Sequence, residues 1–489
     1  MREFEVTFNS FNGLRAFKHS VKPGLLECYN LMPGGDEGLL PYEPILQLEP
    51  LAPACGLWIV DEWPWPKVFF GSKVILGFAL ADAHDCGSGI PNYNEQIVLY
   101  EMTNDGNWSV EAMKSLGFST NIDQINVVDF GYFYVVSAFG YLNQNPNIFC
   151  VARILDTVKP NAQYNIGDIS SFPPFISGCN FNGQAVVGGI KSINDIWSDR
   201  KLYSICWSGI GNFDFNPFND VTAGFVDLPW TENEIIYSVR KLGNQVVVFG
   251  SGGVVALHPV SDPVSTFGIR NLSLPGIRSG NHVAGDDNLV GWVDINNDFW
   301  LMDGTLKSKK LGYQEWISEL DNGEIVVSFL SEKKRFYIAT KSLCYVLSEF
   351  GLSSCHQKMT SVGKYQDDFY GFFLNTLDYE WRLETTNIDF KQRGFKTLQS
   401  IEIHGIDEYV SGKVKFKSRI SDENYQETDW KSFNPNGILS VIVSGSDFKF
   451  CVSGNNYLTT RGAQEIKLRL KQTDKRNIRG LYNANPNIS

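Results

Sequence analysis

Cysteine pairs and metal-binding spacings are missing from this chain. Its nine cysteines in 489 residues are widely spread, and no two of them form a Cys-x-x-Cys pair. Their odd number and wide spacing argue against both a disulfide framework and a zinc knuckle. We therefore expect buried, reduced thiols. The cysteines are Cys28, Cys55, Cys86, Cys150, Cys179, Cys206, Cys344, Cys355 and Cys451.

Long apolar runs and helical periodicity are equally scarce. No apolar run approaches the roughly 18 residues that a membrane-spanning helix needs. The first residues, Met1 to Glu5, begin no apolar signal region, so we expect no secretion and assembly in the cytosol. Only residues 109–116 and 314–320 have the spacing of two helical turns. An all-helical protein and a membrane-spanning protein are both disfavoured.

Aromatic residues and glycine are abundant instead. The chain has 34 Phe, 20 Tyr, 12 Trp and 45 Gly, with 43% hydrophobic and 20% charged residues. These overall fractions are those of an ordinary globular protein, and the length allows two to four domains at roughly 100–200 residues each. Aromatic residues with frequent glycine favour many short strands joined by tight turns.

Seven apolar runs, most of them followed by a polar turn and a second run, recur along the middle of the chain. Their first residues lie 36 to 61 positions apart, whereas four-stranded propeller blades repeat about every 40–50 residues. The later spacings fit, and the earlier ones require insertions. The pattern predicts an all-β protein whose residues 67–386 form a β-propeller of about six to seven blades. The runs are 74–78, 132–136, 184–187, 245–249, 288–292, 324–328 and 369–373.

The chain on either side of the predicted propeller differs from it. Prolines and glycines interrupt residues 22–66 repeatedly, and proline removes a backbone donor and fixes φ. We therefore predict that residues 1–66 form an extended N-terminal arm and first strands, with no long helix and no central strand between 22 and 66. In residues 387–489, Val414 and Phe416 alternate with Lys413, Lys415 and Lys417. This period of two predicts a smaller C-terminal β domain that resembles a sandwich.

Charge is unevenly distributed along the chain. The formal net charge is −12. From Asn387 onward there are 16 Lys and Arg against 11 Asp and Glu, a balance of +5, which leaves −17 for the preceding part. An acidic chain does not coat nucleic acid over its whole surface, although a local basic patch still binds phosphate.

Two glycine- and aspartate-rich motifs resemble ligand loops but depart from them. Residues 250–253, Gly-Ser-Gly-Gly, precede a strand-like run rather than the helix that a phosphate loop requires, so a hairpin turn is predicted. The series Asp294, Asn296 and Asp298 resembles the start of a calcium loop. Phe299 stands where that loop requires glycine and Thr305 where it requires glutamate, so a turn is predicted here as well.

Catalytic and metal-binding patterns are weak. Asp82, His84, Asp85 and Cys86 form the densest group of ligand-type residues, but four neighbours in one loop cannot all face one ion. No Gly-x-Ser-x-Gly elbow occurs, and none of the six His lies in a recognised pairing with Ser or Cys. A pair of carboxylates for glycoside hydrolysis stays possible in principle, but no pair is favoured by its position. We expect no enzyme activity, no metal site and no cofactor.

The most concentrated positive feature lies near the C-terminus. It comprises Lys467, Arg469 and Lys471, followed by Lys475, Arg476 and Arg479. Such a run is either a solvated strand face and loop, or a contact to a phosphate backbone or to an acidic neighbouring subunit. For the second alternative, Lys475, Arg476 and Arg479 are the candidate assembly or phosphate-contact residues.

A distinctive order of short motifs occurs between residues 207 and 250. A strand with Trp207 is followed by Ala-Gly at 223–224, Leu-Pro at 228–229 and a Leu-Gly-polar-Val-Val-Phe run at 242–249. This order resembles a blade segment in tail proteins of double-stranded DNA bacteriophages. The opening and closing segments are similar to those proteins too, and the nearest family is the tail nozzle, or packaged-DNA-stabilisation, family of short-tailed phages.

The resemblance implies a non-enzymatic structural protein of the virion tail, assembled in the host cytoplasm. Family members are propeller proteins that form a homohexameric tube, which prolongs the DNA channel and retains or releases the genome. The implied partners are further copies of the chain, adaptor or ring proteins, tail fibres, and double-stranded DNA that passes without sequence-specific contact. A closed ring requires a head-to-tail interface, and an acidic channel lining avoids adhesion to phosphate.

Two other functions stay open on the sequence. A carbohydrate-binding or carbohydrate-active propeller would use some of the many aromatic residues to stack on sugars, although the same residues also suit blade cores. A cellular interaction propeller would have the same strand pattern. Residues 207–250 favour the phage tail protein over both.

Overall fold

The computed structural model divides the described chain into two compact units. Unit 1 contains residues 1–44, 343–358 and 375–489, and unit 2 contains residues 45–342 and 359–374. The structure describes residues 2–8, 13–14, 25–33, 39–41, 46–47, 57–59, 68–70, 75–83, 95–102, 108–115, 121–130, 133–142, 145–154, 173–191, 200–212, 214–260, 266–320, 325–340, 342–365, 368–373, 380–388, 395–404, 412–420, 424–455 and 465–472. These units divide the chain differently from the predicted boundaries at 66 and 386, because strands from both ends of the chain pair in unit 1.

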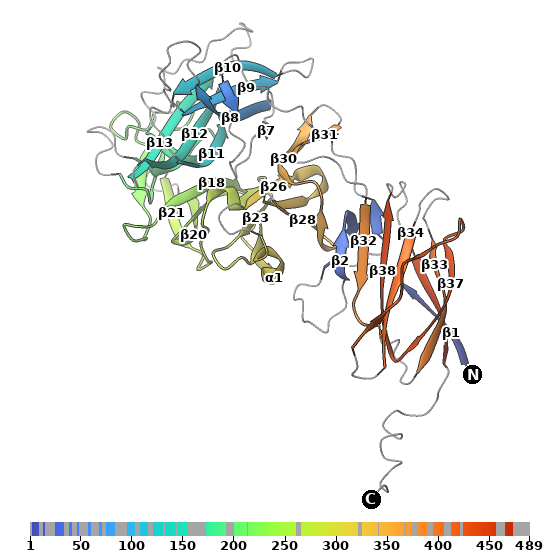
Figure 1. Cartoon of the computed structure of the whole chain (residues 1–489). Helices are drawn as coiled ribbons and strands as arrows, with labels where there is room; N and C mark the ends of the chain where they lie inside the picture. Colours follow the sequence, from blue (N-terminus) through green and yellow to red (C-terminus); the bar gives the residue numbers. More distant parts are fainter. Residues whose placement is uncertain are drawn as a thin grey trace, which may run out of the picture. The chain divides into compact units, whose positions relative to one another are not determined.

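Unit 2 is a succession of small antiparallel sheets (Figure 1). Its first two sheets contain β6 (Leu57–Ile59), β7 (Val68–Phe70), β8 (Ile75–Ala83), β9 (Glu95–Met102) and β10 (Trp108–Ser115), and then β11 (Asn121–Asp129), β12 (Phe133–Leu142) and β13 (Asn145–Ile154). Two four-stranded sheets follow, with β14 (Phe175–Phe181), β15 (Gln184–Ile190), β16 (Ser204–Trp207) and β17 (Gly224–Asp227), and then β18 (Ile236–Leu242), β19 (Gln245–Gly250), β20 (Gly253–Val260) and β21 (Thr266–Asn271).

The later part of unit 2 continues the series. A third four-stranded sheet contains β22 (Val283–Gly285), β23 (Leu289–Val293), β24 (Phe299–Asp303) and β25 (Ser308–Gly312). The remaining strands are the hairpin β26 (Val326–Leu330) and β27 (Arg335–Ala339), and the sheet of β30 (Met359–Tyr365), β31 (Asp368–Phe373) and β5 (Leu46–Gln47). All seven predicted apolar runs therefore contribute to strands.

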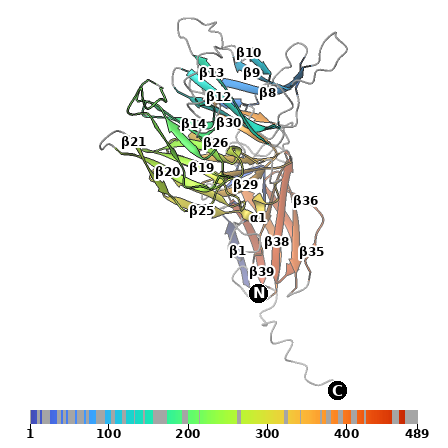
Figure 2. The same cartoon turned by 90° about the vertical axis from the view of Figure 1, so that its left-hand side faces the viewer.

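The core of unit 2 lies between neighbouring sheets. On β19, Val246 and Val248 belong to a buried cluster that includes Trp207 of the preceding sheet. Val247 and Phe249 face the other way, into a cluster that includes Trp292 of the following sheet. The continuous Val-Val-Val-Phe run is thus buried on both faces, as expected for a strand that lies between two packed sheets. Figure 2 shows β19, β20 and β21 side by side within this layer.

The two ends of the series of sheets in unit 2 lie next to each other. The backbone N–H of Val68 on β7 donates to Ser361 Oγ on β30 at 3.2 Å. Gly363 on β30 lies so close to the Phe70 ring that an added Cβ would come within 2.3 Å of it. Strand β5, which precedes the first sheet in the chain, pairs in parallel with β31 of the last sheet. These contacts give unit 2 the closed, propeller-like arrangement that the sequence predicts.

Unit 1 contains two larger sheets and one two-stranded sheet. In the first, the N-terminal strand β1 (Arg2–Phe8) pairs with β39 (Glu465–Gln472), and the sheet continues through β33 (Lys396–His404) to β37 (Ile438–Gly445). In β39, Ile466, Leu468 and Leu470 are buried while the residues between them are more exposed. The alternation predicted for residues 413–417 is confirmed in β34 (Gly412–Arg419), where Val414 and Phe416 are buried, and β39 has the same pattern.

The second sheet of unit 1 corrects the prediction about residues 22–66. Strand β2 (Leu25–Tyr29) has a neighbour on each side, because Tyr29 pairs with Ser354 of β29 (Gly351–Cys355) and with Arg382 of β32 (Glu380–Thr385). A central strand forms because the run that begins after Pro23 contains no proline before Pro33. The other strands are β28 (Cys344–Ser348), β38 (Asp447–Asn455), β34, β35 (Gln426–Glu427) and β36 (Lys431–Ser432), and β3 (Leu31–Pro33) pairs separately with β4 (Leu39–Pro41).

The two predicted helices have different outcomes. Residues 314–317 form the short helix α1 (Gln314–Ile317), as predicted. Residues 108–115 form strand β10 instead, so the prediction of a helix at 109–116 is wrong. Pairing with β9 along its whole length, with a bulge between Val110 and Ala112, overrides the local spacing. No helix of the described residues is long and apolar enough to cross a membrane.

Candidate functional site

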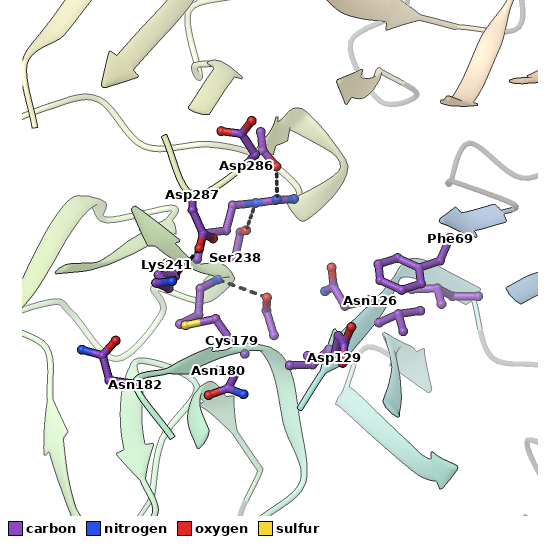
Figure 3. Close-up of a pocket in the computed structure, with 18 of the residues that line it drawn as sticks. Phe69, Asn126, Asp129, Cys179, Asn180, Asn182, Ser238, Lys241, Asp286 and Asp287 are labelled. Atoms are coloured by element: carbon purple, nitrogen blue, oxygen red, sulfur yellow. Dashed lines mark hydrogen bonds and ion pairs between the residues drawn. The ribbon is translucent and has the colours of Figure 1, made fainter. Parts of the chain in front are cut away.

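Unit 2 contains a cavity of about 710 Å³, which we call the central cavity. It is lined by β7, β11, β14 and β18 and by Gly285, Asp286 and Asp287 at the end of β22 (Figure 3). Strands β11, β14, β18 and β22 are each the first strand of their sheet. The cavity therefore gathers one edge of several successive sheets, which is where ligand sites of propellers lie.

Polar side chains on these first strands fasten neighbouring sheets to one another. Asn126 on β11 donates through Nδ2 to the carbonyl oxygen of Ile176 on β14 at 2.9 Å. Ser177 on β14 accepts through Oγ from the backbone N–H of Val239 on β18 at 3.1 Å. These polar groups line the cavity, but their main hydrogen bonds are already made within the protein.

Arg240 is the most deeply placed charge of the central cavity. Its guanidinium donates to the carbonyl oxygens of Val283 at 3.0 Å and Gly285 at 3.4 Å, and to Ser238 Oγ at 3.2 Å. Burial lowers the pKa of Arg240 to about 10, so the group stays charged at neutral pH. Among the described residues no carboxylate pairs with it. Its positive charge is therefore solvated by backbone carbonyls and joins β18 to β22.

The acidic groups of the central cavity have structural partners. Asp287 forms an ion pair with Lys241 at 2.6 Å. Asp286 accepts from the backbone N–H groups of Asn288 at 2.8 Å and Leu289 at 2.9 Å, which shapes the turn between β22 and β23. Both carboxylates thus hold turns and strands in position.

The environment of Cys179, which lines the central cavity, makes its thiol unreactive. Burial raises the pKa of Cys179 to about 12, with a smaller contribution from Asp287 in the same direction. Because the thiolate is the nucleophile, a thiol of such high pKa is inert at neutral pH. The seven cysteines of the described chain form no disulfide and are buried or half-buried. No group of three His, Cys, Asp or Glu among the described residues has the arrangement of a metal site.

The predicted assembly residues lie beyond the last described strand. Lys475, Arg476 and Arg479 fall in residues 473–489, outside the described residues, as do His84, Asp85 and Cys86 of the predicted ligand-type group. The part of the basic run that lies on β39 has acidic neighbours within unit 1. Lys467 pairs with Glu465 at 2.9 Å, and Arg469 lies 3.4 Å from Glu5 on β1. Here the interpretation as a solvated strand face fits the structure.

Both motifs that resemble ligand loops are turns, as predicted. Gly250 ends β19 and Gly253 begins β20, and the two residues pair directly across a hairpin. Asp294 accepts through Oδ1 from the backbone N–H of Asn296 at 2.7 Å and of Asp298 at 2.9 Å, and through Oδ2 from Trp300 Nε1 at 2.9 Å. Its carboxylate thus binds its own loop.

The residues that resemble phage tail proteins have packing roles. Trp207 is buried, and Gly224 lies against its ring so closely that an added Cβ would come within 2.7 Å. Leu228 is buried in the same cluster. Gly243 has a φ of +56° in the turn between β18 and β19, where a Cβ would come within 2.4 Å of the Gly304 carbonyl oxygen. The motif order at 207–250 therefore describes how one sheet packs on the next.

Comparisons with known proteins add weak likenesses. No family model matches the chain, and no curated protein matches it. BamB from Moraxella catarrhalis is similar with 7% identity and a TM-score of 0.31, over 68% of this chain and 96% of that one. PorZ of the Porphyromonas gingivalis type-IX secretion system shares 10% identity with a TM-score of 0.32, over 76% and 46%. An exo-β-1,3-galactanase from Phanerochaete chrysosporium shares 9% with a TM-score of 0.26, over 87% and 98%. Likenesses of this size carry no argument about function.

Sequence reasoning did not find the central cavity. Its residues come from five strands spread between Val68 and Asp287, and none of them stands in a recognised motif. The sequence signal that indicates the position of the cavity is the first strand of each strand group, because the first strands of successive blades face the same axis. Arg240 lies in such a strand, two residues after Ser238, to which it donates.

Proposed function

We propose that the chain is a non-enzymatic structural protein of a phage tail, in line with its resemblance to tail nozzle proteins. In this proposal unit 2 is a propeller of seven blades, one for each strand group from β6–β10 to β30–β31. The two larger sheets of unit 1 form a β-sandwich. The contact between β7 and β30 and the pairing of β5 with β31 support a closed ring of blades.

The observation that carries the proposal is an exposed apolar loop between β16 and β17, residues 208–223. In this loop Phe218 is 95% exposed and Val221 is 76% exposed, and Ile210 is also exposed. Phe225, in the following strand, is 43% exposed, with the Arg200 guanidinium over its ring. Monomeric proteins expose such side chains singly, whereas a group of them marks a surface that another molecule covers.

Hydrogen bonds within the 208–223 loop hold its described residues in one conformation. Asp220 accepts from the backbone N–H of Thr222 at 2.8 Å and from Asn212 Nδ2 at 2.5 Å. Asp214 accepts from the backbone N–H of Asn216 at 2.9 Å. A loop that is ordered before binding loses little conformational entropy on association, which suits a permanent assembly contact.

A second copy of the chain is the occupant that we propose for this loop. Residues 207–229 contain three Asp and no Lys or Arg, whereas the C-terminal region from 387 has a balance of +5. Contact between the acidic loop of one copy and the basic C-terminal region of the next is heterologous, and contacts of this kind form a ring when the rotation between copies closes. The hexamer number, the adaptor, ring and fibre partners, and DNA passing through the channel follow from the family resemblance and belong to the same proposal.

Negative-stain electron microscopy of the purified chain tests the proposal, and we expect ring-shaped particles. Replacing Phe218 and Val221 together by Ser removes apolar area that is exposed in the monomer. Ring formation is therefore expected to fall by about tenfold or more, the equivalent of about 1.4 kcal/mol, with unchanged thermal unfolding. The control is Ile295→Ser, since Ile295 is exposed in a different turn. Strict monomers at high concentration, or full assembly of the double variant, would contradict the proposal.

A further inference from the structure

Unit 1 contains a second cavity, of about 470 Å³, on a face of the sheet formed by β2, β32, β38 and β34. We call it the Trp430 cavity, after the aromatic residue between β35 and β36 that lines it. The small side chains of Cys451 and Ser453 on β38 also line it, between longer charged side chains of the flanking strands. The hollow exists because β38 has short residues where its neighbours have long ones.

Strand register places opposite charges on the two sides of this cavity. Glu27 on β2 pairs in register with Glu384 on β32, which pairs with Cys451, which in turn pairs with Lys415 on β34. In the next row on the same face, Ser453 lies between Arg382 and Lys413. The cavity therefore has carboxylates on the side of β2 and β32, together with Arg382, and lysines on the side of β34.

Some of these charges are already used inside the protein. Lys417 binds Glu384 at 3.0 Å, and Arg382 binds Glu380 through two nitrogens at 2.7 and 2.8 Å. Among the residues that the structure describes, the side chains of Glu27 and Lys413 make no hydrogen bond and no ion pair. The cavity thus offers an acceptor and a donor to a ligand.

Trp430 adds a flat apolar surface beside these polar groups. Its side chain is exposed, with 46% of its surface open to solvent. Aromatic rings are favoured where one side of a partner is apolar and its edge is wet. A pyranose ring has this character, because its C–H groups form an apolar face and its hydroxyls project from the rim.

The location and charge of the cavity argue against other ligand classes. The cavity lies on the face of strands whose edges are already paired, so a peptide cannot add to it as a further strand. The phosphodiesters of a nucleic acid backbone have no hydrogen-bond donor for Glu27, and an inorganic phosphate presents no apolar face to Trp430. A sugar hydroxyl, by contrast, donates to a carboxylate and accepts from a lysine in the same site.

We propose that the Trp430 cavity binds an acidic saccharide of the uronate type. One sugar ring lies on Trp430, hydroxyls along the saccharide chain bind Glu27 and Ser453, and a carboxylate of the chain binds Lys413. This site is independent of the proposed tail function, since a saccharide site in unit 1 requires neither the ring nor the 208–223 loop.

Isothermal titration of the full chain with tri-galacturonate tests the site. Binding is expected, with weaker binding of the methyl-esterified trisaccharide, which keeps the hydroxyls and lacks the charge. Trp430→Ala is expected to weaken both ligands by about tenfold or more, a loss typical of one good contact. Lys413→Gln is expected to abolish the preference for the acid over the ester.

Lys431→Gln is the matched control, because Lys431 is an exposed lysine on β36 that does not line the cavity. Thermal unfolding of each variant checks that unit 1 is folded. The proposal is overturned if neither trisaccharide binds, if Trp430→Ala binds both as well as the original chain, or if inorganic phosphate competes as well as the uronate does. Rings that form without saccharide binding refute this site alone, and saccharide binding by a strict monomer refutes the ring alone.

Discussion

At the scale of single residues, His282 is a buried group whose protonation opposes folding. It lies in the short 3-10 helix η1 (Gly280–His282) of unit 2 and is almost fully buried. Burial, together with a smaller contribution from Arg278, lowers the pKa of His282 to about 4, and a hydrogen bond with the backbone of Val293 acts in the opposite direction. The imidazole is therefore neutral in the folded protein at neutral pH.

We expect unit 2 to lose stability as the pH falls from about 6.5 to 4. In that range the unfolded chain protonates His282 at its ordinary pKa of about 6.5, and the folded chain does not. The free energy of unfolding is expected to drop by about 2 kcal/mol between pH 7 and pH 5 from this residue alone. Urea unfolding at several pH values measures the drop.

The His282→Leu variant is expected to show a flatter pH profile of stability over the same range. His258→Leu is the control, since His258 is exposed on β20. Equal pH slopes for the original chain and His282→Leu would show that His282 does not control this loss.

At the scale of elements, β1 stands out because it joins the first residues of the chain to the last described strand. It pairs with β39 over seven residues, from Arg2 with Gln472 to Phe8 with Ile466. Without β1, β39 would present an unpaired sheet edge, which is a template for aggregation. The N-terminal segment thus has a role within unit 1 that its sequence alone did not indicate.

Deleting residues 1–8 is expected to destabilise unit 1. The loss is expected to be roughly 3 kcal/mol or more, at about 0.5–1.5 kcal/mol for each net backbone hydrogen bond. Calorimetry measures the change, and light scattering detects aggregation through β39. Replacing Glu3 and Glu5 together by Gln keeps the strand and removes its exposed ion pairs, and is expected to cost less than 1 kcal/mol. Equal stability of the deleted and full chains would contradict a structural role for β1.

At the scale of the whole molecule, the two ends of the sequence differ in net charge. The region from residue 387 has a balance of +5 against −17 for the rest. The proposed ring uses this difference, with an acidic loop on one copy and basic residues on the next. Electrostatic contacts of this kind steer association and weaken with added salt.

Replacing Lys475, Arg476 and Arg479 together by Ala is expected to weaken assembly more than it changes folding of the monomer. Analytical ultracentrifugation at low and high salt measures the assembly, and thermal unfolding measures the folding. The original chain is expected to assemble less well at high salt, and the triple variant to depend less on salt. Unchanged assembly together with unchanged melting would remove these residues from the interface.

Local sequence determined most of the strands and several turns. The Val246–Phe249 run, the alternation in Val414 and Phe416, and the turn at Asp294 follow from periodicity and turn chemistry within a few residues. The short helix α1 follows from local spacing too. Such features depend on neighbours in the chain, and one sequence is sufficient to predict them.

Only the tertiary structure decided which distant segments meet. The pairing of β1 with β39 and the central place of β2 depend on partners far along the chain, and no local pattern specifies them. The strand at residues 108–115 pairs with its neighbour β9, and this pairing overrides the local helical spacing. Both cavities arise in the same way, since Arg240 and Glu27 gain their neighbours from strands of other segments. Which strands pair is decided by the burial of whole sheet faces, and this involves residues far apart in the sequence. The sequence therefore predicted the strands of this protein, whereas its sites emerged only from the fold.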